Sequence, residues 1–86
     1  MITGAQVRAA KSLLRWSGND LSIKANVSLS SIRRIEAFDW IPDSASVKVL
    51  NAIEKALERG GVEFIGSPED SPGVRFTTKK SLEDQS

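Results

Sequence analysis

The feature that most constrains this chain is a helix-start signal that recurs at short intervals. Thr3-Gly4-Ala5-Gln6 has the spacing in which an N-cap hydroxyl and the N3 side chain satisfy each other's backbone donors. Ser17 and Ser28 offer further N-caps, and Asn26 between them suits the left-handed conformation that ends a helix. The first half of the chain is therefore expected to fold as several short helices.

Beyond the third helix the pattern changes twice. Asp43 can cap a longer helix, whose apolar stripe of Val47, Leu50, Ile53 and Leu57 continues until Gly60-Gly61. The segments "VEFI" and "GVRF" then alternate apolar and polar residues around "GSPEDSP", which predicts a β-hairpin with a longer loop.

The sequence thus predicts a mainly α fold in a single domain of residues 1–77. Its expected elements are helices at about 4–16, 18–25, 28–38 and 44–59, a C-terminal β-hairpin at about 62–76 and a flexible tail at 78–86.

Composition narrows the function classes. The chain has no Cys and no His, so thiolate metal sites and the commonest general base are absent. The carboxylates show no metal-ligand spacing, and no Gly-rich phosphate loop follows a strand. We therefore expect no enzyme, cofactor or metal. Neither a membrane-spanning apolar run nor a secretory signal is evident, which predicts a cytoplasmic location away from the membrane.

Charge is unevenly distributed although its total is only +1. Residues 1–40 hold six Lys or Arg against three Asp or Glu, whereas residues 41–86 hold six against eight. A basic excess in the first half is compatible with a polyanion-binding face, but ordinary domains also show differences of this size.

The two predicted helices at 18–25 and 28–38 have the dimensions of a helix-turn-helix. Apolar residues would pack them together: Leu21, Ala25, Val27, Ile32 and Ile35. The second helix would then direct Leu29, Ser30, Arg33 and Arg34 away from the core. Arg33 and Arg34 are either two solvated charges or, in this context, part of a nucleic-acid surface.

Several segments make the chain similar to one family: "ITGAQVRAAKSLLRWS", "A-N-VS…I-RRIEA" and "ALERGGVEFI". It resembles the lambda-repressor-like, Cro/CI-type (Xre) helix-turn-helix regulators. The resemblance covers Ile2 to about Phe76. It implies a lambda-repressor-like four-helix domain that binds double-stranded DNA, with the helix from Ser28 to Ala37 in the major groove.

The resemblance also implies roles for individual residues. The positions that read base edges are Leu29, Ser30 and Arg34. Phosphates would be held by Ser28, by Arg33 and by backbone N–H groups at the starts of the second and third helices, in the second helix at Gly18 and Asn19.

Two further expectations concern the support of the third helix. Lys11 and Glu36 occupy positions where the family commonly pairs a base with an acid, and such a pair should contribute little if it is exposed. Gly18 stands where the family usually has a phosphate-binding Gln, so one anchor is missing. Phe38 replaces a Gly that often ends the recognition helix.

These observations predict a transcriptional regulator, in the default case a repressor that binds a pseudo-palindromic operator as a homodimer. The alternative is a protein-interaction module, or an antitoxin-like partner of a second protein, with the same fold and little or no DNA affinity.

Overall fold

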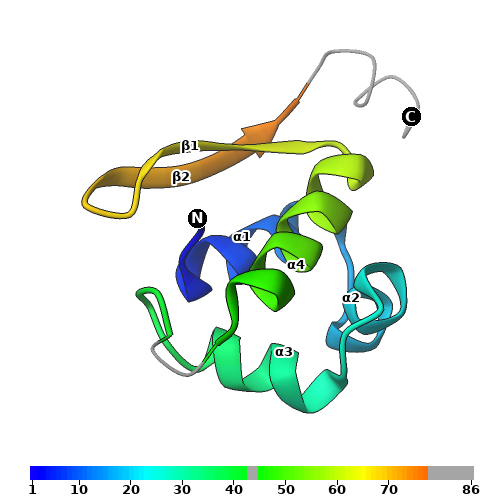
Figure 1. Cartoon of the computed structure of the whole chain (residues 1–86). Helices are drawn as coiled ribbons and strands as arrows, with labels where there is room; N and C mark the ends of the chain where they lie inside the picture. Colours follow the sequence, from blue (N-terminus) through cyan, green and yellow to red (C-terminus); the bar gives the residue numbers. More distant parts are fainter. Residues whose placement is uncertain (43–44, 78–86) are drawn as a thin grey trace.

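A computed structural model of the chain describes residues 1–42 and 45–77. This part contains four α-helices followed by a two-stranded antiparallel hairpin (Figure 1), which confirms the predicted mainly helical fold class. The elements are α1 (Gly4–Leu14), α2 (Gly18–Ala25), α3 (Leu29–Glu36), α4 (Val47–Gly60), β1 (Val62–Ser67) and β2 (Asp70–Phe76). The proposed cap Asp43 and the predicted tail lie outside the described residues.

The local start signals act as the sequence predicts. Thr3 and Gln6 form a capping box at α1: the Gln6 N–H donates to Thr3 Oγ1 at 3.1 Å, and the Thr3 N–H donates to Gln6 Oε1 at 2.9 Å. Ser17 and Asp20 form a second box at α2. The Ser28 hydroxyl accepts the Ser31 N–H at the start of α3.

Three helix boundaries differ from the predicted ones by two residues or more. The first helix ends at Leu14 rather than at about 16, because Arg15 adopts a left-handed conformation and its N–H closes the last turn. The third helix spans Leu29–Glu36 and stops short of 38. The fourth begins at Val47, with Ser46 rather than Asp43 as its N-cap, and Val47 is exposed instead of forming part of the buried stripe.

The hairpin is confirmed, but its loop is shorter than predicted. Val62 pairs with Phe76, and the pairing continues to Ser67 opposite Asp70, so only Pro68 and Glu69 remain between the strands. A bulge between Ile65 and Ser67 allows this, since Gly66 takes a positive φ of 74° that Gly adopts readily.

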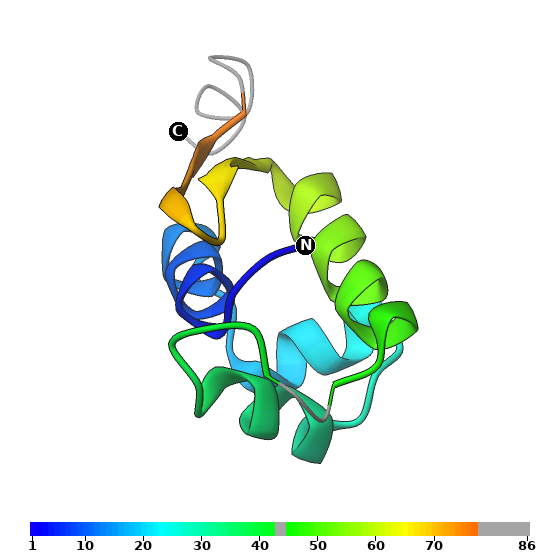
Figure 2. The ribbon, with the colours of Figure 1, turned by 60° about the vertical axis from the view of Figure 1, so that its left-hand side comes forward.

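The core lies between the hairpin and α3, which occupy opposite ends of the molecule with α1 and α4 between them (Figure 2). It is built from the residue before the α1 N-cap, the inward faces of all four helices and the start of β1: Ile2, Val7, Ala10, Leu21, Ala25, Ile32, Ile35, Leu50, Ile53, Ala56, Leu57 and Val62. Among the described residues, no helix combines the length and apolar character needed to cross a membrane.

Gln6 also attaches the hairpin to the helices. Its side chain is buried, and Nε2 donates to the Gly73 carbonyl at 2.8 Å, with the Ile65 carbonyl at 3.5 Å. One amide therefore serves the α1 capping box and both strands. A two-stranded hairpin is marginal alone, so this anchor helps to fix its position on α1.

Candidate nucleic-acid interface

The turn between α2 and α3 is closed by local hydrogen bonds. Asn26 adopts a left-handed conformation, with φ 55° and ψ 48°, and its N–H donates to carbonyls of the last turn of α2. The Val27 N–H bonds the Ser22 carbonyl at 3.1 Å, and the Ser22 hydroxyl bonds the Val27 carbonyl in return. This short turn fixes the direction in which α3 leaves α2.

The two faces of α3 differ sharply. Ile32 is fully buried and Ile35 is 2% exposed, so this side of the helix is held in the core. At 3.6 residues per turn, Ser30 lies near the centre of the opposite side and is flanked by Arg33 and Arg34. All three are exposed. The helix therefore presents one small polar side chain between two guanidinium groups.

Ala37 belongs to the same exposed surface, although no role was predicted for it. It is the C-cap residue of α3, is exposed, and lies seven residues, about two turns, beyond Ser30. In the sequence, the only sign that Ala37 shares a face with Ser30 was their separation by seven residues, which brings two positions to the same side of a helix. A small apolar side chain here could contact a thymine methyl group.

Leu29, unlike its neighbour Ser30, is only partly exposed to solvent. It is half-buried, and its Cδ1 lies 3.0 Å from the point that a Cβ on Gly18 would occupy. The leucine thus fills the space beside Gly18. Leu29 covers α2 with part of its surface, so less of it is available to a base than the sequence suggested.

The predicted phosphate contacts lie around a groove between α1, α2 and α3. The groove has a volume of about 320 Å³ and is lined by Lys11, Ser17, Gly18, Asn19, Leu29, Ile32, Arg33 and Glu36. The first N–H groups of α2, including those of Gly18 and Asn19, have no acceptor within the helix. The structure therefore brings three predicted phosphate contacts, Gly18, Asn19 and Arg33, to one groove.

Ser28 is the fourth predicted phosphate contact, and its hydroxyl already has local partners. Ser28 Oγ accepts the Ser31 N–H at 3.2 Å, lies 2.8 Å from Ser31 Oγ and is 3.3 Å from Ser30 Oγ. A phosphate would have to take over the hydroxyl proton from Ser31 while the cap to the backbone remained.

An acidic side chain lies at the same end of α2. Hydrogen bonds from the Ser17 backbone N–H and from its hydroxyl lower the pKa of the exposed Asp20 carboxyl, and the nearby Lys24 adds to the effect. The carboxylate stabilises the helix start, where the dipole is positive. It also places a negative charge near the groove, which opposes phosphate binding there.

Two cations of α1 brace the far end of α3. Lys11 Nζ lies 2.7 Å from Glu36 Oε1, and both side chains are only 17% exposed. The pair therefore lies in a largely buried site rather than the exposed one for which a small contribution was expected. Removing Lys11 would leave a carboxylate with poor access to water.

Arg8 is the second brace, and the sequence gave it no such role. Its guanidinium donates to the carbonyls of Glu36 and Phe38 and pairs with the Asp39 carboxylate. It thus caps carbonyl groups at the C-terminus of α3. Arg8 precedes Lys11 by three residues, so the two cations share one face of α1. That spacing was the only sequence signal for a joint role.

Gly4 allows the chain after α3 to approach α1 closely. A Cβ on Gly4 would lie 1.9 Å from the Phe38 carbonyl oxygen and 2.3 Å from that of Ile35. The Gly4 N–H also donates to the Trp40 carbonyl at 3.0 Å. Close backbone contact with α1 and the Arg8 cap together hold the chain where α3 ends.

No protein-family profile matches the chain, and no curated protein sequence matches it. Within residues 1–42 and 45–77, no group of three or more acidic side chains is arranged to hold a metal ion.

Proposed function

We propose that this protein is a sequence-specific DNA-binding transcriptional regulator of the lambda-repressor-like type. One observation carries the proposal: α3 follows a tight left-handed turn, is held in the core by Ile32 and Ile35, and exposes Ser30 between Arg33 and Arg34. A helix supported in this way can enter the major groove with its polar face towards the bases.

The exposed residues suit different parts of a DNA site. Arg34 can donate two parallel hydrogen bonds to guanine, and Ser30 can donate or accept without strong selectivity. Leu29, with its remaining exposed surface, can contact a thymine methyl group. Arg33 lines the groove beside Gly18 and Asn19, which favours a phosphate contact supported by the N–H groups of α2.

Eight residues of α3 span about 12 Å, which gives access to only a few base pairs. We therefore propose a homodimer on a pseudo-palindromic operator, which doubles the number of bases that are read. Repression would follow from occlusion of the promoter. With about four phosphate contacts per subunit, the log-log salt dependence of the dimer should have a slope on the order of −7.

The decisive experiment is selection of bound sequences from a random DNA pool, repeated with arginine variants. Arg34→Ala should weaken binding to the selected site by about 1–3 kcal/mol and relax the preference at one base position. Arg33→Ala should weaken binding to all sequences alike and reduce the salt slope by about 1. Arg75→Ala removes an exposed arginine of β2, far from α3, and serves as the matched control.

Two outcomes would contradict the proposal. Selection that enriches no motif would remove sequence-specific binding. Equal effects of the Arg33, Arg34 and Arg75 substitutions would mean that only the overall charge matters, not the face of α3.

An interaction module is the second candidate, and features of the groove favour it. Gly18 supplies no side chain for a phosphate, Leu29 covers part of the available surface, and Asp20 adds a negative charge nearby. If selection fails, this fold would act through a protein partner.

A further inference from the structure

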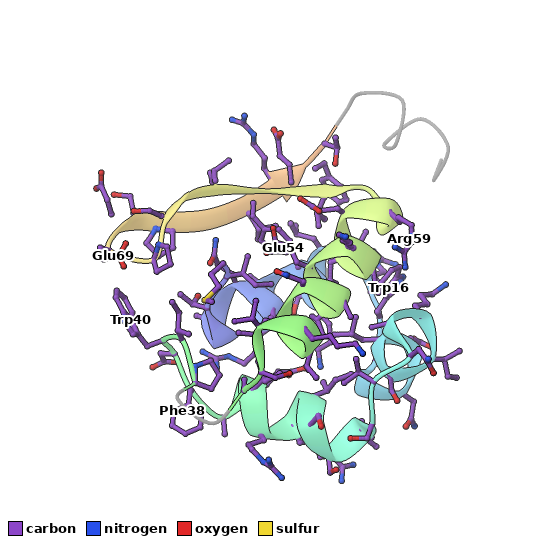
Figure 3. The ribbon with its side chains drawn as sticks, in the orientation of Figure 1. Trp16, Phe38, Trp40, Glu54, Arg59 and Glu69 are labelled. Carbon is purple, nitrogen blue, oxygen red and sulfur yellow. The ribbon has the colours of Figure 1, made fainter. Side chains whose placement is uncertain are left out.

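A second surface lies at the end of the molecule where α3 finishes. The loop after α3 leaves Phe38 46% exposed and Trp40 54% exposed, and Met1 is 56% exposed. Figure 3 shows Phe38 and Trp40 on the side opposite Trp16, with Trp40 below the hairpin loop that carries Glu69. Met1 lies near this loop in the chain path, because Gly4, three residues later, donates its N–H to the Trp40 carbonyl. We call Met1, Phe38 and Trp40 the apolar end.

A groove between α1 and β2 begins beside the apolar end. Its volume is about 330 Å³, and its lining includes Ala5 and Ala9 from α1, Pro72 and Val74 from β2, and Asp39 from the loop. The two alanines and Gly73 have small side chains or none, so they leave space in the groove. A protruding indole and an apolar groove are thus adjacent, since Asp39 and Trp40 are consecutive residues.

If a partner covered the α1–β2 groove, it would bury no unpaired charged side chain among the residues that line it. Asp39 is the one charged residue among those that line the groove, and it is paired with the Arg8 guanidinium. A partner that covered the groove would therefore not need to neutralise a free charge, and burial of this pair would cost less than burial of an unpaired carboxylate. A mainly apolar partner surface fits better than an acidic or basic one.

We propose that the apolar end and the α1–β2 groove form the interface between two copies of the chain. Trp40 of each copy would lie in the groove of the other. Such an exchange is self-complementary under a two-fold axis, because the protruding side chain and the groove occur on the same surface.

The apolar end would supply part of the area that such an interface needs. The three residues of the apolar end together expose about 300 Å² of mainly apolar surface. A standard interface buries about 800 Å² on each side. The groove walls on α1 and β2 would have to supply the remainder.

The position of the interface also bears on the arrangement of the two α3 helices. The loop that carries Trp40 follows the C-terminal end of α3, so this interface would place the C-terminal ends of the two α3 helices towards the two-fold axis. To read one operator, the dimer would have to hold the two helices about 34–36 Å apart, the separation of adjacent major grooves on one side of the duplex. This role rests on the proposed function, whereas the interface itself does not.

The test is sedimentation equilibrium of the full chain and its variants over a range of concentrations, without DNA and with a palindromic duplex. Trp40→Ala and Ala9→Glu should each weaken self-association at least about tenfold, because they remove the indole or place a carboxylate in the groove. Ile23→Ala is the matched control: Ile23 is 80% exposed on α2, so its truncation should leave association unchanged.

A spectroscopic measurement tests the same contact. In a Trp16→Phe background, Trp40 is the only indole, and its emission should shift to the blue as the dimer forms.

The interface is overturned if the chain stays monomeric with and without DNA, or if Trp40→Ala and Ala9→Glu associate like the parent. It is also overturned if Trp40→Ala lowers affinity for a single half-site without changing association, because Trp40 would then be a DNA contact. Trp40-dependent dimers that select no DNA motif would retain the interface and refute the proposed function. Arg34-dependent binding of a DNA motif by a monomer would retain the DNA-binding proposal and refute the interface.

Discussion

Replacement of Lys11 by Met tests whether α1 braces the proposed recognition helix through a buried charge. At 2.7 Å, and with an effective dielectric constant of about 20, the attraction between Lys11 and Glu36 is about 6 kcal/mol before desolvation is subtracted. Desolvation offsets most of this gain, so the net value of the pair is small. Loss of one partner costs more, because the remaining carboxylate stays only 17% exposed.

We expect Lys11→Met to lower the free energy of unfolding by about 1–3 kcal/mol, measured by urea denaturation. Glu36→Leu added to that variant should recover part of the loss, because it removes the unpaired charge. The hairpin supplies a matched control: Arg75 pairs with Glu63, but their side chains are 64% and 39% exposed. Arg75→Met should therefore change stability by no more than about 0.5 kcal/mol.

Equal effects of Lys11→Met and Arg75→Met would refute this reasoning, because burial would then make no difference to the cost of breaking an ion pair. A further loss of stability in the Lys11→Met, Glu36→Leu double variant would also contradict it. In that case Glu36 would be needed for its own packing rather than for its pairing with Lys11.

Two further predictions concern other parts of the scaffold. Gly4→Ala should destabilise the fold by about 1–3 kcal/mol in urea denaturation, because its Cβ would lie 1.9 Å from the Phe38 carbonyl oxygen; Gly73→Ala, which meets only the Ile65 side chain at 3.2 Å, should cost less. Asp20, with its lowered pKa, should stabilise the fold fully at pH values above its ordinary value of 3.8 and progressively less as the pH falls below it. The stability difference between the parent and Asp20→Asn should therefore shrink on acidification, and a constant difference would contradict the capping role.

Much of the fold could be predicted from the sequence because its signals are local. The capping box of Thr3 and Gln6 and the left-handed turn at Asn26 join residues only a few positions apart. Helical periodicity likewise identified the buried face of α3 at Ile32 and Ile35. The length of the hairpin loop was missed, because the Gly66 bulge depends on the pairing register of two strands.

Less of the candidate site could be predicted. The exposed positions of Ser30, Arg33 and Arg34 follow from helical geometry, but their DNA contacts stay a prediction. The partial burial of Leu29 could not be read from the sequence, since it depends on how closely α3 packs against Gly18. The role of Arg8 was missed for the same reason: its partners lie about 30 residues away in the chain.

The sequence by itself determined where the first three helices of this protein begin and which side of α3 is buried, because short-range hydrogen bonds and side-chain periodicity fix both. Tertiary structure alone decided how α3 is supported and what it leaves exposed. Lys11 and Arg8 brace its end, Leu29 fills the space beside Gly18, and Trp40 protrudes next to a groove. These features arise from packing between elements distant in the chain, where the shape of the neighbouring element determines the surroundings of each side chain.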